Sequence, residues 1–481
     1  MRHSRSFLAT LLIAVPALIA PFPTFAGQAT VKTDLSPEQE FARKQLVDTV
    51  LLYDRHFRIP ETGQYLDSVR FGQAPGRENL SSIAATGIGL MSLAIGDRLG
   101  VIPDAEEKAE ITLANLLNTN KSAGFFTQRS QSGWYHHFIN GRTGEAVGGS
   151  KGIYSTIDTA ILAAGTAIAG NYFAAKTASD NADAMAPVAK KAWDLIYSID
   201  WAQSIRSVDF PGIHQVFRGV EEEIENRFWS LPFDEYVVLP CLGHAVEQMN
   251  GEAGKATEFY QEHLAEIRDL PQRAFRGRTI LSTGGNKFVS HFTLQFAFYF
   301  CRSLATDPIY LAELGDAMEA DRMWFQIKGQ NTYPERYWGL GAGSEIVWDE
   351  ARQKPEKYRY GVASLRKNPN HMMSPAIMAG FLPVEVAGLS DQTGGAEASA
   401  IVRDLQALYE AGECRYPHFD LEILWRCSAV DPTVPVRRVQ GIDLSTYMLG
   451  LAAFDPAFGL EFYETYAPGA ESTMAIMMAA Q

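Results

Sequence analysis

A short segment near the middle of the chain holds two acidic residues among aromatic ones. Asp234 and Glu235 stand directly ahead of an apolar run, with Trp229, Phe233 and Tyr236 around them. A carboxyl group in such surroundings is partly desolvated, which raises its pKa and lets it keep a proton near neutral pH. Cleavage of a sugar linkage needs a general acid of this kind. The alternative is the first turn of a helix, where acids favour the positive end of the helix dipole.

A second segment, a glycine-bounded loop, combines aromatic residues with histidine. Trp134, Tyr135 and His137 lie within six residues of one another. Such residues suit stacking on sugar rings and recognition of hydroxyl groups, but they would equally pin a loop if their rings were buried. His136 and His137 are adjacent and lack the i, i+4 spacing of a helical metal site. We therefore expect no metal and no cofactor.

Three further residues stand at loops or at expected helix starts. Asp158 would lie in the first turn of a helix capped by Ser155 or Thr156, and Asp443 lies where a loop enters an apolar helix. An acid at a helix start usually stabilises the helix and nothing more. Trp338 stands beside a glycine-rich turn and could either wall a sugar subsite or anchor a buried loop.

The sequence contains no Gly-x-Ser-x-Gly elbow and no convincing Cys/His nucleophile pair. The glycines near Trp338 do not match a phosphate-binding loop, because no Lys-Ser/Thr pair follows them. What remains are well-separated acids on loops with aromatic neighbours. Glycoside cleavage uses this set of residues: one protonated carboxyl group helps the leaving oxygen depart, and one carboxylate activates water.

Residues 1–26 read as a secretory signal peptide. Arg2 and Arg5 precede an apolar run over residues 7–20, and Thr24-Phe25-Ala26 ends in the small-residue pattern of a cleavage site. The apolar run is too short for a comfortable membrane span, and no later segment resembles a transmembrane helix. We therefore expect an exported protein, periplasmic or secreted, with one domain over residues 27–481 and no insertion into the membrane.

Composition limits the partners of this domain. The formal net charge is −14 at pH 7, and loss of Arg2 and Arg5 makes it two units more negative. An acidic surface argues against nucleic acid and against anionic membranes, whereas a neutral glucan is compatible with it. Hydrophobic residues make up 46% of the chain, which is ample material for a large core. We expect a monomer.

The four cysteines fall into two pairs. Cys414 and Cys427 are close enough in sequence to bridge a loop, and an oxidising compartment permits the bond. The spacing leaves open whether this bridge forms. Cys241 and Cys301 lie in apolar helical runs and are expected to be buried thiols.

Helical patterns separated by Gly- and Pro-containing loops follow Ser36, which is suited to cap the first of them. Beyond this first helix, we expect helices over residues 83–99, 104–117, 157–175, 183–199, 236–249, 255–264, 293–304, 312–327, 395–411 and 444–454. Pro240 would kink the helix over 236–249 or delay its start. Strand patterns are scarce, with 214–217 and 279–282 as weak candidates. Long loops rich in aromatic, Gly and polar residues cover 124–150, 206–232, 281–292, 330–375 and 414–441. This pattern predicts a single all-α domain, an α/α toroid with its function on long loops at one end.

In order and spacing, the motifs resemble the bacterial glucoamylase-like domain. That domain includes glycoside hydrolase family 144, the endo-β-1,2-glucanases, and the cyclising domain of cyclic β-1,2-glucan synthases. Residues 133–138 are similar to its Gly-x-x-Tyr-His-Phe loop, residues 155–162 to its Ser-x-x-Asp-Thr-Ala-Leu segment, and residues 229–239 to its Trp-x-x-Tyr-Asn-Glu-Ala segment. The resemblance runs from about Glu38 to about Tyr463. It implies an (α/α)6 toroid, a metal-free hydrolytic site, a glucan substrate and a catalytic acid at Glu235.

Departures from the family pattern, among them the absence of its Ser-Pro-Thr stretch after Glu235, mark a diverged branch. The family's Asn-Glu-Ala reads Asp-Glu-Tyr at residues 234–236, and Ser445-Thr446-Tyr447 replace its Asn-rich block after Asp443. The motifs and the resemblance together predict an inverting endo-β-1,2-glucanase. A β-1,2-glucan transglycosylase on the same fold and a non-catalytic periplasmic glucan-binding protein are the alternatives.

The roles expected for the site residues follow from this reading. Glu235 is the proton donor, Asp443 is the first choice for the base, and Asp158 either holds substrate hydroxyls or a water molecule, or replaces Asp443 as the base. The expected substrate-binding residues are Trp134, Tyr135, His137, Trp229, Asp234, Tyr236 and Trp338.

Overall fold

The computed structural model describes residues 35–73, 79–122, 124–150, 152–180, 186–209, 211–219, 223–224, 229–231, 233–282, 287–349, 354–389 and 399–469. The chain divides into two units, Met1–Asp34 and Leu35–Gln481. The predicted signal peptide falls in the first unit and lies outside the described residues.

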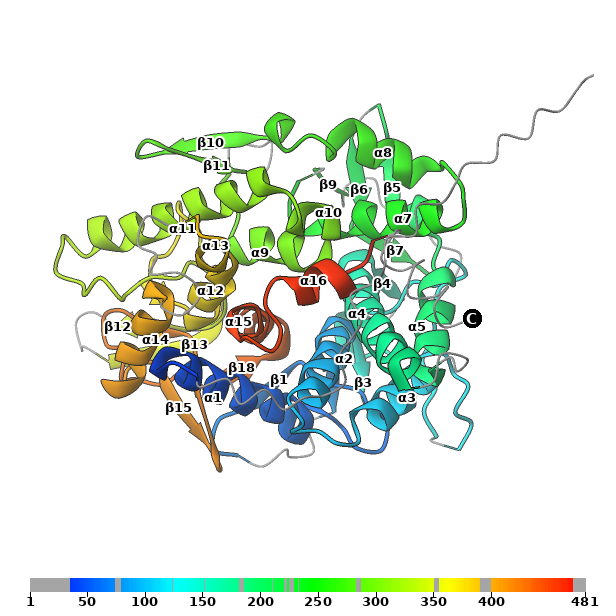
Figure 1. Ribbon diagram of the computed structural model, residues 1–481, viewed down its shortest axis with the longest axis horizontal. Coiled ribbons are helices and arrows are strands. Elements are labelled where there is room, and N and C mark those ends of the chain that lie inside the picture. Colours follow the sequence, from blue (N-terminus) through cyan, green and yellow to red (C-terminus); the bar gives the residue numbers. More distant parts are fainter. Residues whose placement is uncertain are drawn as a thin grey trace, which may run out of the picture. The chain divides into compact units, whose positions relative to one another are not determined.

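Helices make up most of the regular structure (Figure 1). They are α1 Pro37–Leu52, α2 Ile83–Arg98, α3 Ala105–Leu116, α4 Thr156–Asp180, α5 Pro187–Tyr197, α6 Trp201–Ser204, α7 Val238–Met249, α8 Lys255–His263, α9 His291–Phe300, α10 Arg302–Ala305, α11 Pro308–Lys328, α12 Pro375–Gly380, α13 Leu382–Val386, α14 Ala400–Glu410, α15 Gly441–Phe454 and α16 Glu461–Tyr466. Of the helices described, none is long and apolar enough to cross a membrane.

Local sequence signals explain where two helices begin. Ser36 caps α1 as predicted: its side chain accepts from the Gln39 N–H at 3.3 Å, and the Gln39 side chain accepts from the Ser36 N–H at 3.0 Å. A 3₁₀ turn, Glu235–Val237, precedes α7. Pro240 then falls in the first turn of α7, where its missing N–H costs no hydrogen bond. The delayed start expected at Pro240 is therefore what the structure shows.

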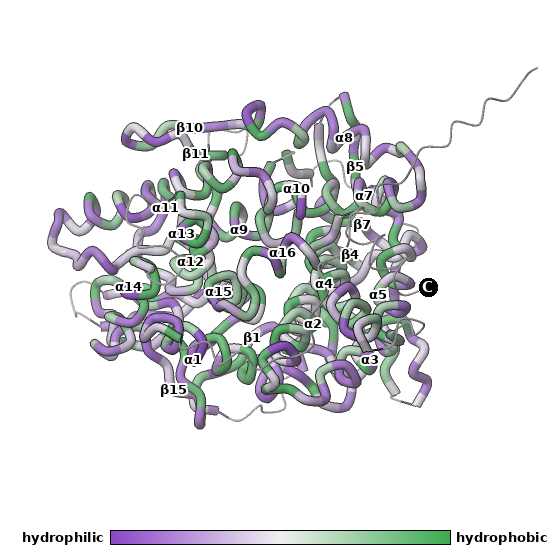
Figure 2. The backbone as a smooth tube through the Cα atoms, viewed as in Figure 1, coloured by the Kyte–Doolittle hydropathy of each residue, from purple (hydrophilic) through white to green (hydrophobic). Residues whose placement is uncertain are grey.

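Six buried helices contact one another in chain order. α2 contacts α4, α4 contacts α7, α7 contacts α9, α9 contacts α12, α12 contacts α15, and α15 contacts α2. A second set packs against them: α1 on α15 and α2, α3 on α2, α5 on α4, α8 on α7, α11 on α9 and α14 on α12. Nearly every residue of α2 and α15 is buried, and Figure 2 shows both helices coloured largely as hydrophobic.

The contact between α2 and α4 is a backbone contact. A Cβ atom added at Gly165 would lie 2.0 Å from the carbonyl oxygen of Gly87, and one at Gly87 would lie 2.5 Å from Cα of Leu162. No larger residue fits at either glycine without moving the helices apart. The Ala- and Gly-rich composition of 83–99, which predicted close helix packing, is explained by this contact.

Strands are more numerous than the sequence predicted, so the expectation of an all-α chain needs correction. They are β1 Ser68–Arg70, β2 Leu80–Ser82, β3 Phe138–Asn140, β4 Ile153–Ser155, β5 Ile205–Ser207, β6 Gly212–His214, β7 Val216–Arg218, β8 Glu223–Ile224, β9 Trp229–Ser230, β10 Gln272–Phe275, β11 Arg278–Leu281, β12 Ala342–Asp349, β13 Lys354–Val362, β14 Met372–Met373, β15 Arg415–His418, β16 Leu421–Leu424, β17 Cys427–Ser428 and β18 Arg438–Gln440. All described pairs are antiparallel, in sheets of two or three strands.

Two of these pairings contribute residues to the wall of one cavity. β1 pairs with β18 in the register Ser68↔Gln440, which joins segments from opposite ends of the domain. β12 and β13 form a long hairpin inside the stretch 330–375 that was expected to be a loop. Residues of β13 are mostly exposed or half-buried, so this strand lacks the apolar alternation that reveals strands in a sequence. The candidate strand over 279–282 is confirmed as β11, and that over 214–217 breaks at Gln215 between β6 and β7.

Cysteine placement follows the sequence interpretation. Cys414 and Cys427 form a disulfide, with Cα atoms 5.2 Å apart, and it closes the segment that contains the β15–β16 hairpin. Cys241 and Cys301 are free and buried.

Candidate active site

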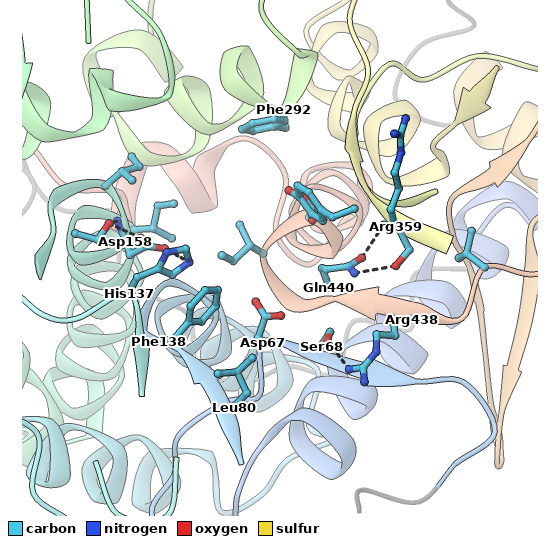
Figure 3. A pocket seen from close by; sticks show the side chains of 18 of the residues that line it. Asp67, Ser68, Leu80, His137, Phe138, Asp158, Phe292, Arg359, Arg438 and Gln440 are labelled. Atoms are coloured by element: carbon cyan, nitrogen blue, oxygen red, sulfur yellow. Dashed lines mark hydrogen bonds and ion pairs between the residues drawn. The ribbon is translucent and has the colours of Figure 1, made fainter. Parts of the chain in front are cut away.

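A cavity of about 1570 Å³ lies where several of the buried helices begin (Figure 3). Its walls come from the starts of α4, α9 and α15, from the 3₁₀ turn before α7, from the segments before α2 and from the β12–β13 hairpin. The acidic residues in its described lining are Asp67, Asp158, Glu235 and Asp443. The aromatic ones are Phe71, Phe138, Tyr236, Phe292, Phe296, Tyr358 and Tyr360.

Glu235 reaches the cavity from the 3₁₀ turn that opens α7. Asp234 caps this turn, because its Oδ1 accepts from the Tyr236 N–H at 2.8 Å. Burial and, to a smaller extent, the negative charges of Asp234, Asp158 and Asp443 together raise the pKa of Glu235 to about 7. Both interpretations of this segment hold: Asp234 is a helix-start acid, and Glu235 is a carboxyl group that keeps a proton near neutral pH.

Asp443 enters the cavity from the first turn of α15 and is only 8% exposed. Burial raises its pKa to about 7, against the opposing effects of the Arg426 charge and of a hydrogen bond from Tyr360. In that bond, Tyr360 Oη donates to Asp443 Oδ1 at 3.2 Å. A donor and a cation that face a carboxyl group both favour its ionised form.

Asp158 lies in the first turn of α4, as predicted. Ser155 rather than Thr156 caps this helix: Ser155 Oγ accepts from the Asp158 N–H at 3.3 Å and donates to Asp158 Oδ2. His137 Nε2 lies 3.5 Å from Asp158 Oδ1, which joins the two predicted site residues (Figure 3). Both carboxylate oxygens are therefore oriented by neighbouring side chains.

Asp67 is a site residue that sequence reasoning missed. Figure 3 shows its carboxylate pointing into the cavity, with Asp158 and His137 on one side and Gln440 on the other. Burial raises the pKa of Asp67, and the Asp158 charge acts in the same direction while His137 opposes it. The backbone of Asp67 accepts from the Gly441 N–H at 2.9 Å, so the β1–β18 pairing places it beside α15. No local motif marks this acid, because its position depends on a pairing distant in sequence.

Two predicted substrate-binding residues, Trp134 and Tyr135, do not reach the cavity. Both are fully buried. Trp134 Nε1 donates to Gln203 at 2.9 Å, and the indole packs against Phe217 with ring centroids 5.6 Å apart. Tyr135 Oη donates to the carbonyl oxygen of Leu116 at 3.0 Å. The prediction that these rings stack on sugar is wrong, and the alternative of a loop pinned by buried aromatics is correct.

Trp338 is likewise a buried anchor and not a subsite wall. Its side chain is fully buried, its Nε1 donates to Asp404 Oδ2 at 3.1 Å, and the Arg322 guanidinium lies 4.5 Å from the ring centroid. The expected role of Trp338 in substrate binding is therefore wrong. Saturated hydrogen bonding and an occupied ring face leave this indole nothing to offer a ligand.

The remaining predicted residues are placed as follows. His137 and Tyr236 line the cavity, and the His137 ring stacks on Phe138 with centroids 3.7 Å apart. Asp234 caps the turn but is not among the lining residues. Trp229 lies in β9, paired with His214, and its side chain lies outside the described residues. Within the described part of the chain, no three His, Cys, Asp or Glu side chains are grouped so as to hold a metal ion.

Solved structures of other proteins share the fold of this chain. No protein-family model matches the chain, and no curated protein matches it by sequence. Several solved structures match almost end to end. An endo-β-1,2-glucanase from Chitinophaga pinensis, solved with sophorotriose and glucose, is 14% identical with a TM-score of 0.65, covering 92% of this chain and 98% of the other. A candidate glucoamylase from Bacteroides caccae is 16% identical with a TM-score of 0.67, with the same coverage of 92% and 98%.

An endo-β-1,2-glucanase from Talaromyces funiculosus, solved as a Glu-to-Gln variant with β-1,2-glucan, is 12% identical with a TM-score of 0.58, covering 92% of this chain and 89% of the other. The resemblance predicted from the motifs is thus confirmed for the fold: the chain is built like glucoamylase-like proteins and endo-β-1,2-glucanases. Identities this low establish the fold alone.

Proposed function

We propose that the protein is a glycoside hydrolase that cleaves β-1,2-glucan within the chain and inverts the anomeric centre. The observation that carries this proposal is the pair of cavity carboxyl groups, Glu235 and Asp443, each with a pKa raised to about 7 by burial. The fold shared with two endo-β-1,2-glucanases supports the choice of substrate. A cavity of about 1570 Å³ has room for several sugar units.

The two carboxyl groups take opposite roles in this reaction. Glu235 donates its proton to the glycosidic oxygen, and the bond from that oxygen to the anomeric carbon breaks. Asp443 accepts a proton from a water molecule, which attacks the anomeric carbon from the opposite face. An inverting site needs roughly 6.5–9.5 Å between the carboxyl groups to admit this water. The product gains a reducing end, and the enzyme exchanges one proton at each group.

The surroundings favour this assignment of acid and base. Negative charges at Asp234 and Asp158 favour the protonated form of Glu235. A cation at Arg426 and a hydrogen bond from Tyr360 favour the ionised form of Asp443. The pKa of both groups is raised to about 7, so what distinguishes the acid from the base is the kind of group that surrounds each and not the size of the shift.

Asp158, Asp67 and His137 complete the polar wall of the cavity. We assign Asp158 and Asp67 to sugar hydroxyls, since a carboxylate accepts two hydroxyl hydrogen bonds well. Asp158 remains the second candidate for the base, because it too interacts electrostatically with Glu235. Tyr236, Tyr358 and Tyr360 offer rings to the substrate in place of the buried tryptophans.

We also propose an architecture and a cellular location for the protein. The cyclic contacts of α2, α4, α7, α9, α12 and α15, each with an outer partner, support an (α/α)6 toroid with the cavity at the helix N-termini. Residues 1–26 direct export, and the domain over 27–481 then acts as a monomer in the periplasm or outside the cell.

The test is to incubate the protein lacking residues 1–26 with linear β-1,2-, β-1,3- and β-1,4-glucans and with α-glucans, followed by chromatography of the products. Short oligosaccharides from the β-1,2 polymer alone are the expected result. Cleavage of another glucan alone would overturn the substrate. Rearranged chains without new reducing ends would replace hydrolysis by transglycosylation, and binding without any product would leave a glucan-binding protein.

A further inference from the structure

Aromatic and imidazole rings run from the cavity wall to the surface of the β15–β16 hairpin. Phe71, which lines the cavity, stacks on Tyr416 with centroids 4.5 Å apart and meets the edge of His418 at 6.2 Å. The His418 ring meets Phe419 at 4.9 Å and His56 at 4.3 Å. These rings are in contact one after another, so they form a continuous row that begins in the cavity.

Phe419 ends this row and is held in an unusual position. Its side chain is 56% exposed, and its ring lies parallel to that of His56, at 7° and 5.1 Å between centroids. Its backbone is in the left-handed region, with φ of +58°. Phe419 and Asp420 form the two-residue turn between His418 and Leu421, and a positive φ at the first position alone of such a turn favours Gly there. A bulky residue in this conformation is uncommon and points to a role other than folding.

Polar contacts fix the hairpin tip against the segment that carries Phe71. The Gly72 N–H donates to His418 Nδ1 at 3.1 Å. On the other side of the tip, Arg55 Nη1 donates to Asp420 Oδ2 at 3.0 Å. The turn that presents the exposed ring is therefore tied to the domain on both sides, and the paired Arg55 and Asp420 are polar groups beside the turn. An aromatic face with hydroxyl-binding groups at its edge suits a sugar ring better than an apolar protein surface.

We infer that Phe419, backed by His56, is an outer binding site for a sugar unit of a glucan chain that continues out of the cavity past Phe71. The inference rests on the proposed function, because the occupant is the far part of the same chain. A short oligosaccharide that fills only the cavity does not reach Phe419, whereas a long chain does. The site therefore contributes to the preference for long chains over short ones.

The test measures binding without turnover. Glu235→Gln protein is titrated with long linear β-1,2-glucan and, separately, with the β-1,2-linked trisaccharide, and the ratio of the two affinities is taken. Phe419→Ala in this background is expected to lower the ratio about three- to tenfold, since one aromatic stacking contact is lost. Phe419→Trp is expected to keep the ratio, because a larger ring replaces the phenyl group.

Two matched variants separate binding from folding. Phe419→Asn removes the ring but suits the left-handed backbone, so the ratio should fall while the melting temperature does not. Phe126→Ala removes another exposed phenyl group, 64% exposed and outside the ring row, and should leave the ratio unchanged. An unchanged ratio in both Phe419→Ala and Phe419→Asn, or an equal fall in Phe126→Ala, overturns the outer site. If the Glu235→Gln protein with Phe419 intact binds neither ligand, the proposed substrate is overturned, and the outer site with it.

Discussion

The two helix starts that carry Glu235 and Asp443 are alike in the burial of their carboxyl groups and differ in the charged groups around them. Both side chains enter the cavity at the first turn of a buried helix, and burial raises both pKa values to about 7. Around Glu235, the interacting charges are carboxylates alone: Asp234, Asp158 and Asp443. Around Asp443, the Arg426 cation and the Tyr360 hydroxyl oppose the effect of burial, and the charge of Asp67 adds to it.

The origin of this difference lies in what packs on each helix start. The 3₁₀ turn before α7 follows a short segment rich in acids and aromatics. The start of α15 is covered by the β12–β13 hairpin, whose Gly343 and Gly361 carbonyls accept from Arg426 Nη1 at 2.8 and 2.7 Å. The hairpin thus holds a buried cation, which is 1% exposed, behind the cavity wall. The hairpin and the cation that it holds therefore favour the ionised form of Asp443, whereas every group that shifts the pKa of Glu235 raises it.

The largest effect is expected when the acid loses the proton that it donates. Glu235→Gln keeps the size of the side chain but has no proton to donate, so kcat on linear β-1,2-glucan is expected to fall by about 10²–10⁴-fold. The rate of appearance of reducing ends measures the loss, with circular dichroism as the control for folding. Activity within a few-fold of the parent would contradict the role of Glu235.

Comparing two aspartates separates the first choice for the base from the second. Asp443→Asn is expected to lower kcat by about 10²–10⁴-fold, whereas Asp158→Asn should mainly raise KM, because Asp158 is assigned to substrate hydroxyls. Initial rates over a range of glucan concentrations give both constants. The reverse pattern would transfer the role of the base to Asp158.

Burial of Glu235 should also lower the free energy of unfolding at pH values where its carboxyl group is ionised. In the folded state the pKa of Glu235 is about 7, above its ordinary value of 4.5. Its protonation stabilises the fold at low pH, and this contribution is lost as pH rises through about 7. Glu235→Gln is therefore expected to raise the free energy of unfolding above pH 7 by about 1–3 kcal/mol, with little gain below pH 4.5. Urea denaturation at pH 4 and pH 8 measures the difference, and an equal effect at both would contradict the burial of a protonated carboxyl group.

A smaller change should weaken the base alone. Tyr360→Phe removes the hydrogen bond to Asp443 Oδ1, so the pKa of Asp443 rises and the acidic limb of the kcat/KM profile moves to higher pH. We expect a loss of about two- to fivefold at pH 7. Tyr358→Phe, on the same strand and also in the cavity lining, is the matched control and should leave the acidic limb in place.

The smallest change should weaken the acid alone. Asp234→Asn removes a negative charge beside Glu235 but keeps a side-chain oxygen to cap the Tyr236 N–H. The pKa of Glu235 then falls, and the alkaline limb of the profile moves to lower pH while the acidic limb stays. Movement of the acidic limb instead would show that Glu235 is not the group that must stay protonated.

Local signals in the sequence predicted what local structure decides. The Asp234-Glu235 pair, the Ser155 cap and the delayed start of α7 at Pro240 are set by residues a few positions apart, and the structure shows all three. The order of helices follows the same rule, since their apolar patterns lie within each segment. The short helices α12 and α13 were missed because each has a proline in its first two residues, Pro375 in α12 and Pro383 in α13, and proline interrupts a helical pattern when read in sequence.

The parts of the site that sequence reasoning missed depend on distant pairings. Asp67 reaches Asp443 through β1 and β18, and Tyr360 reaches it through a hairpin with little apolar alternation. The errors at Trp134 and Trp338 have another cause. A tryptophan beside glycines is compatible with a subsite wall and with a buried anchor, and only the partners of its indole N–H, here Gln203 and Asp404, decide between them.

The most direct test of the acid–base assignment is the anomeric form of the first product. Linear β-1,2-glucan is mixed with the parent protein and with Glu235→Gln, and proton NMR follows the new reducing ends from the first minutes. The account predicts that the parent releases the α-anomer first, which then mutarotates, and that Glu235→Gln releases almost nothing. Initial release of the β-anomer, or equal rates in the two proteins, would contradict it.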